Sequence, residues 1–208
     1  MRMNFKNILA LKASLGIALF SAPGLAIDLA AHEATYEMSL LSASTEAQMT
    51  AIAGKTNFIL RKDCEGWISS EDYLLEFAYE TGDSAILASH FESWEELSGQ
   101  LYSFEVDERS TFEEEKQFNG FATVTKAGKT GEAFFSMQPD VALRLPDKVY
   151  FPVAHTKEVL SRAQKEEKIF TANIFFGAEP DRAIKRTSTV IGSRQKVTNS
   201  RILGELAS

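Results

Sequence analysis

The tetrapeptide Ala-Gly-Lys-Thr, at 53–56 and again at 127–130, comes nearest to phosphate-binding chemistry in this sequence. A phosphate-binding loop needs a further glycine five positions before its Gly-Lys pair, and then a helix whose first N–H groups face the phosphates. Met49 and Thr123 stand where that glycine would be, and no helical pattern follows either segment. We therefore interpret both tetrapeptides as hairpin turns.

Nucleophile and metal motifs are also missing. Ser193 and Lys196 have the Ser-x-x-Lys spacing of penicillin-recognising enzymes, but no partner motif stands where that fold needs one. His32, His90 and His155 belong to no metal-binding pattern, and no Gly-x-Ser-x-Gly elbow is present. A triad assembled only by the fold is the remaining route to a hydrolase. We predict no catalytic residue, no metal and no cofactor.

Residues 1–26 have the three parts of a secretory signal peptide. A basic start precedes the apolar run 13–20, and Gly24 and Ala26 occupy the −3 and −1 positions of a cleavage site. The apolar run is too short for a membrane span, which takes about 20 residues, and Pro23 interrupts its continuation. We predict export to the periplasm and no stable membrane span.

The charge of the exported chain limits its partners. The whole chain has 22 Lys+Arg and 29 Asp+Glu, and three of the cations lie in 1–26, so 19 cations and 29 anions remain, a formal charge of −10. This balance argues against nucleic-acid binding and against adhesion to anionic lipid, because both depend on clustered cations.

Cys64 is the single cysteine. A lone cysteine is unusual in an exported chain, because export routes oxidise paired thiols. Three interpretations are open: a buried, inert thiol, a disulfide to another chain, or a partner that has been lost.

An alternation of apolar and polar residues dominates the chain after residue 26. In 34–40, for example, Ala34, Tyr36 and Met38 share one face, and Thr35 lies on the other. Such alternation predicts strands with one buried and one wet face. The strands expected on this basis are 34–40, 47–61, 72–79, 85–94, 101–106, 115–125, 132–137, 168–176 and 184–191.

Turn signals separate these runs. They are Gly54-Lys55, Gly82-Asp83, Ser98-Gly99, Asn119-Gly120, Gly128-Lys129 and Gly177. Short strands at this spacing predict a mainly β fold built on an antiparallel sheet, closed or strongly coiled. We expect a single β domain over 27–192 and a polar C-terminal tail over 193–208.

The segment 145–170 departs from the strand pattern. Pro152 stands where a first-turn proline fits, and a narrow apolar stripe of Val159, Leu160 and Ala163 follows. This predicts one short amphipathic helix, at about 153–167, lying on the sheet. His155 would pack or cap near the start of that helix.

Four blocks, taken together, resemble the cell-envelope-integrity EipB family of exported alphaproteobacterial proteins. They are "AHEATYEMSL" (31–40), "CEGW" (64–67), "LPDKVYFPVAHTKEVLSRAQ" (145–164) and "STVIG" (188–192). Their order and spacing hold over about residues 31–192. The third block, with Leu-Pro, Phe-Pro and Ala-His, is the most specific.

The resemblance implies a coiled antiparallel sheet, in the form of a spiral or an open barrel, with little helix. It implies a soluble periplasmic protein without a known catalytic site. It also implies that the protein supports envelope integrity through protein partners, including one with tetratricopeptide repeats.

Within the third block, the resemblance implies a clasp. Pro146 and Pro152 would fix the path of the chain, Phe151 would plug the core, and the helix would cover a sheet edge or face. Family members continue beyond the fourth block and carry a second cysteine, which pairs with the one matching Cys64. That partner is absent from this sequence.

Two functions from different classes follow. The first is a non-catalytic periplasmic protein that supports envelope integrity by edge-strand pairing with, or groove binding of, a protein partner. The alternative is a binder or carrier of a lipid or a lipoprotein acyl chain in a half-open β shell, which the 15 phenylalanines would suit. The sequence alone does not place Trp67 or Trp94 in the core or on the surface.

Overall fold

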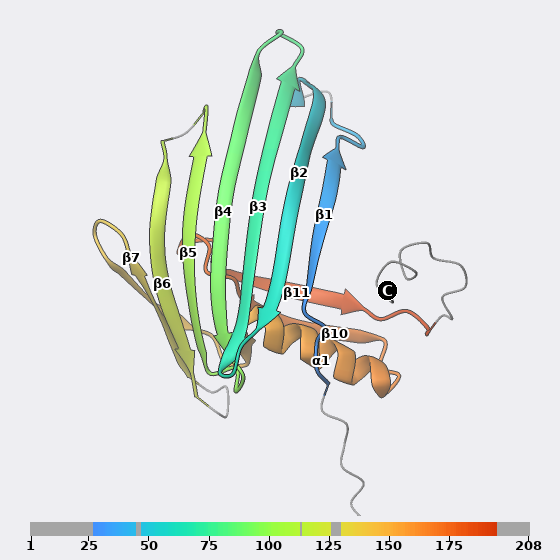
Figure 1. Cartoon of the computed structure of the whole chain (residues 1–208), viewed down its shortest axis with the longest axis vertical. Helices are drawn as coiled ribbons and strands as arrows, with labels where there is room; N and C mark the ends of the chain where they lie inside the picture. The colour runs from blue at the N-terminus through green and yellow to red at the C-terminus, as the bar shows by residue number, and fades with distance from the viewer. Residues whose placement is uncertain (1–26, 45–46, 113, 126–129, 195–208) are drawn as a thin grey trace, which may run out of the picture.

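The computed structural model describes residues 27–44, 47–112, 114–125 and 130–194 (Figure 1). The expected signal peptide, the Gly128-Lys129 turn and residues 195–208 of the expected tail lie outside these ranges. The elements are β1 (His32–Ser39), β2 (Met49–Lys62), β3 (Gly66–Tyr79), β4 (Ser84–Glu96), β5 (Leu101–Ser110), β6 (Lys116–Val124), β7 (Gly131–Ser136), β8 (Val141–Leu145), β9 (Val149–Tyr150), α1 (Pro152–Gln164), β10 (Ile169–Phe175) and β11 (Ile184–Val190).

The first eight strands form one antiparallel sheet in the order of the chain, β1 to β8. A second sheet has the order β11-β10-β9, with β9 parallel and β11 antiparallel to β10. Within the described residues, β1 pairs only with β2 and β8 only with β7, so the large sheet does not close into a barrel. The expected mainly β fold with one helix is confirmed.

The side chains of the large sheet divide between an inner face, which carries the core, and an outer face. Strand β7 alternates strictly between buried and exposed residues, as the period of two predicts. Strands β2, β3 and β4 are 13–14 residues long, which corresponds to about 45 Å.

Two of the predicted turns are wrong. Gly54 lies in the middle of β2, opposite Leu75, and Gly120 lies within β6, opposite Phe104 and Phe135. A Cβ on Gly54 would overlap the carbonyl oxygen of Leu74, and a Cβ on Gly120 would overlap its neighbours in a similar way. These two glycines allow neighbouring strands to approach closely, and the chain does not turn at either of them.

Other predicted turns are found. Gly82 and Gly99 stand between consecutive strands of the large sheet, with φ of 87° and 68°. Gly177 follows β10 with φ of 73°. These left-handed conformations are the ones that glycine adopts without steric cost.

One end of the inner face is covered, and we call it the closed end. Figure 1 shows α1, β10 and β11 lying across the lower ends of the long strands. Rings from both sheets meet there in a buried aromatic cluster. Its largest fully buried members are Tyr102, Phe135, Phe151 and Phe175.

Helix α1 begins as predicted and ends three residues earlier. Pro152 occupies the first turn, and the chain leaves the helix before Glu166, which has φ of 61°. The predicted apolar stripe is not the buried one, because Leu160 is exposed and Val153 is the helix residue that reaches the core. Among the described residues, no helix is long and apolar enough to cross a membrane.

Candidate functional site

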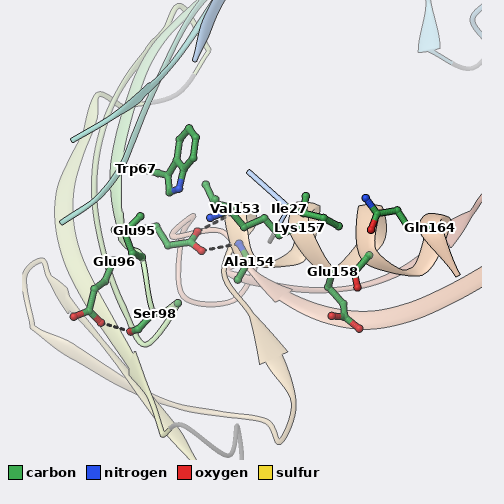
Figure 2. A pocket seen from close by; sticks show the side chains of 13 residues that line it. Ile27, Trp67, Glu95, Glu96, Ser98, Val153, Ala154, Lys157, Glu158 and Gln164 are labelled. Carbon is green, nitrogen blue, oxygen red and sulfur yellow. Dashed lines mark hydrogen bonds between the residues drawn. The ribbon is translucent and has the colours of Figure 1, made fainter. Parts of the chain in front are cut away.

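A buried carboxylate fastens α1 to the large sheet. Glu95, near the end of β4, is 2% exposed, and its two oxygens accept hydrogen bonds from the backbone N–H groups of Val153 (2.8 Å) and Ala154 (2.7 Å). Figure 2 shows both bonds. The first turn of a helix has N–H groups without intrahelical partners, and its positive dipole end favours a negative charge. Glu95 therefore acts as a cap supplied by a distant strand, and we call this contact the Glu95 clasp.

The electrostatics of the clasp are balanced between two effects. Burial raises the pKa of Glu95, whereas the two N–H bonds and the charge of Lys157 lower it. Burial is the larger effect, and the resulting pKa is about 7. The carboxyl group therefore changes charge near neutral pH.

Trp67 lies beside the clasp, opposite Glu95 in the β3–β4 ladder. Its side chain is 1% exposed, and its Nε1 has no hydrogen-bond partner among the residues that the structure describes. The ammonium groups of Lys62 and Lys157 lie over its ring, at 5.3 and 5.1 Å from the centroid. Trp67, Leu60 and Val153 form a small core of their own, separate from the aromatic cluster.

A cavity of about 420 Å³ opens between these residues and the outer turns of α1 (Figure 2). Its lining includes Glu95, Glu96, Ser98, Lys157 and Glu158, and no histidine or cysteine. Among the described residues, no three His, Cys, Asp or Glu side chains gather closely enough to hold a metal ion. The groups around the cavity anchor a helix, and we assign no chemical step to them.

The predicted clasp segment reaches the core through Phe151. Phe151 is fully buried and stacks on Tyr102, with ring centroids 5.1 Å apart. Pro152 follows it as the first helical residue, and Pro146 stands directly after β8, before the turn into β9. The sequence located this segment but did not indicate Glu95, which holds it, because an acidic pair at 95–96 looks like an exposed strand end.

His155 packs rather than caps. Its ring stacks on Phe170, with centroids 5.6 Å apart, and meets the edge of Tyr150. Its Nε2 is buried and finds no hydrogen-bond partner in the described part of the chain, and burial lowers the pKa of the imidazole. The half-buried imidazole therefore packs through its ring rather than through a hydrogen bond at Nε2.

Cys64 and Trp94 do not belong to the buried core. Cys64 is exposed in the turn between β2 and β3, where Asp63 accepts hydrogen bonds from the backbone of Glu65 and Gly66. Trp94 is half-buried and lies on the outer face, opposite Ile68.

The far end of the large sheet differs from the closed end, and we call it the open end. Its inner face carries Tyr36, which is 54% exposed, and Phe112 beyond the end of β5, which is 61% exposed. Half-buried apolar side chains lie between them on β1 to β4, and they are Met38, Ile52, Leu75, Phe77, Tyr79 and Leu87.

Strand β1 forms one edge of this sheet. The N–H of Leu40 bonds to the carbonyl of Ile52, its cross-strand neighbour. Bonded and non-bonded residues alternate in an antiparallel ladder, so the even-numbered residues of β1 bond to β2. The odd-numbered residues Glu33, Thr35 and Glu37 therefore direct their N–H and C=O groups away from β2, where the described residues provide no strand.

The chain was compared with known proteins. A family model described as EipB-like matches residues 23–206. A cell envelope integrity protein, EipB, from Brucella abortus (strain 2308) is 19% identical over 201 residues, which cover 92% of this chain and 69% of that protein.

The fold also has a solved counterpart. A crystal structure of a beta-barrel-like protein of domain of unknown function DUF1849, also from Brucella abortus, superposes with a TM-score of 0.77 at 18% identity. The superposition covers 87% of this chain and 76% of that chain. At this level of identity, the likeness is one of fold.

Proposed function

This chain belongs to the EipB-like family, and from that premise we propose that it is a non-catalytic periplasmic protein that supports cell-envelope integrity by binding a protein partner. Cell envelope integrity is the role given in the name of the relative from Brucella abortus. The partner class suggested by the family resemblance, a protein with tetratricopeptide repeats, is part of the proposal.

One observation carries the binding role, and it is the free edge of β1. Unpaired N–H and C=O groups at a sheet edge form a template for another strand, and many proteins protect such edges with short strands, bulges or covering elements. β1 has eight residues and a regular register with β2 throughout. The apolar inner face beside it adds contact area for whatever binds there.

Proline at position 35 tests this role. Thr35→Pro removes an N–H that points away from β2, so the β1–β2 ladder keeps its own bonds, and proline is tolerated on edge strands. Thr35→Ala is the matched control, because both variants lose the threonine hydroxyl and its bond to Asn57. Each full-length chain, with a C-terminal tag, is crosslinked in cells and purified from the periplasm.

We expect the partner to be captured by the wild type and by Thr35→Ala, and to be lost with Thr35→Pro. Circular dichroism of Thr35→Pro should show the wild-type sheet content. Equal capture by all three chains would show that β1 does not bind the partner. Repeating the capture with Cys64→Ser determines whether an intermolecular disulfide contributes, since the thiol is exposed.

Acyl-chain binding is the second candidate function, and the exposed apolar side chains of the open end favour it. Native mass spectrometry of the protein purified without detergent distinguishes the two functions. A bound lipid mass that Tyr36→Lys removes would support lipid binding, whereas a co-purifying protein that Thr35→Pro removes would support protein binding.

A further inference from the structure

We propose that the free edge of β1 receives an extended segment of a partner protein in which two basic residues, four positions apart, alternate with apolar residues. This inference rests on the proposed function, because it names the chemistry of the segment that would bind there.

The first argument concerns the side chains of β1 on the outer face. Glu33 and Glu37 are both exposed and stand on either side of Thr35. Their contacts within the chain are weak: Glu33 accepts a 3.4 Å bond from Asn57, and Glu37 lies 3.9 Å from the ammonium of Lys55. A long hydrogen bond and an exposed ion pair both contribute little to stability, so both carboxylates can accept a cation from an added strand.

The second argument concerns the inner face of the same strand. Ala34, Tyr36 and Met38 alternate with the glutamates, and Tyr36 is 54% exposed at the margin of the open end. Directly opposite residues on neighbouring strands have Cβ atoms about 4.5–5.5 Å apart. Apolar residues of an added strand would therefore cover Tyr36 and its neighbours.

Together, these positions define a five-residue pattern. An added strand would place basic residues opposite Glu33 and Glu37, any residue opposite Thr35, and apolar residues at the two positions between. The pattern is symmetric about Thr35, so it holds for parallel and antiparallel addition alike. The formal charge of −10 after residue 26 favours a basic segment over a second copy of the same acidic chain.

The test uses three fluorescent peptides and the full-length chain. The first has the core Lys-Val-Thr-Val-Lys, the second Glu-Val-Thr-Val-Glu, and the third the composition of the first in the order Lys-Lys-Val-Val-Thr. We expect fluorescence anisotropy to show binding of the first peptide about tenfold tighter than of the other two, since opposite charges across a strand pair stabilise it and like charges destabilise it.

Charge reversal sharpens the test. The double variant Glu33→Lys with Glu37→Lys should prefer the glutamate peptide over the lysine peptide. The control is Glu76→Lys with Glu92→Lys, which changes the net charge equally at two exposed residues of the interior strands β3 and β4. It should keep the wild-type order of affinities, and Thr35→Pro should bind neither peptide.

The outcomes separate this inference from the proposed function. If both charged peptides bind the wild type equally while Thr35→Pro still loses the partner, the charge pattern is wrong and the protein-binding role stands. If no peptide binds and Thr35→Pro captures the partner normally, both fail, and the glutamates serve only to keep sheet edges apart. A concentration-dependent doubling of mass that Thr35→Pro abolishes would assign the edge to a second copy and overturn the inference.

Discussion

The closed end and the open end are built from the same strands, yet they bury very different amounts of their inner face. At the closed end, the second sheet and α1 supply Phe151 and Phe175, which complete an aromatic cluster with Tyr102. At the open end, Tyr36 and Phe112 carry the same kind of side chain and remain more than half exposed. Burial of apolar surface stabilises a fold by about 25 cal/mol per Å², so the closed end holds the molecule together, whereas the open end leaves apolar surface exposed.

This comparison also explains why α1 is tied down by a carboxylate. Val153 is the one buried residue of α1, so apolar packing holds the helix over a short length only. The Glu95 clasp joins the first turn of α1 to β4 across 58 residues of sequence, and it keeps Phe151 in the cluster.

The largest predicted effect concerns Phe151. Phe151→Ala should lower the free energy of unfolding by about 3–5 kcal/mol, because it leaves a cavity among rings that cannot collapse to fill it. Urea denaturation followed by circular dichroism measures the change. Phe112→Ala is the matched control at the open end, with an expected loss below about 1 kcal/mol. Similar losses at both positions would contradict the division into two ends.

The second prediction is a pH dependence from Glu95. Its folded pKa, about 7, lies above the ordinary glutamate value of 4.5, so the folded chain binds more protons than the unfolded chain between these values. The contribution of this group to stability is fully present below pH 4.5 and is lost as the pH rises through about 7, by about 3 kcal/mol in total. Denaturation of wild type and Glu95→Gln across this range gives the difference between the two stability curves.

The control for this prediction is Glu76→Gln, at an exposed position of β3. The wild-type curve should fall relative to Glu95→Gln as the pH rises, and it should run parallel to that of Glu76→Gln. A constant difference between wild type and Glu95→Gln would mean that folding does not raise the pKa of this carboxyl group.

The third prediction concerns the close approach of β2 and β3 at Gly54. Gly54→Ala should destabilise the fold by about 1–3 kcal/mol, because the new Cβ overlaps the backbone of Leu74 and forces β2 and β3 apart. Gly192→Ala, where a Cβ meets nothing within 4 Å, should leave stability unchanged. Thermal unfolding compares the two, and an unchanged melting temperature for Gly54→Ala would favour the turn that the sequence suggested.

The smallest predicted effect concerns His155. His155→Phe should raise the free energy of unfolding by about 1 kcal/mol, because it keeps the stack on Phe170 and removes a buried nitrogen that has no partner. His90→Phe serves as the control, since His90 is exposed and bonded to Asp72 at 2.6 Å. A loss of stability with His155→Phe would show that Nε2 has a partner in solution.

The sequence predicted the antiparallel, mainly β fold and the position of the helix from local signals. It failed where the local signal was ambiguous. The glycines at 54 and 120 suggested turns because the sequence does not show which carbonyl group lies across the strand from each one. Strands β8 and β9 were missed, since five and two residues are too short for a recognisable alternation.

The sequence also did not indicate which half of the inner face is covered. Trp67 and Trp94 are equivalent in the sequence, and only the ladder places one inside and the other outside. Glu95 carries no local signal at all, because its partners are backbone groups that lie 58 and 59 residues away.

The sequence by itself determined most of the longer strands, the region of the single described helix and that the family is the EipB-like one, because these properties depend on short-range spacing and on motifs. The tertiary structure decided which half of the sheet is covered, which carboxylate holds α1 and that no described strand lies beside the outer edge of β1. These properties depend on contacts between residues far apart in the chain, and such contacts follow from the curvature and register of the whole sheet rather than from any local pattern.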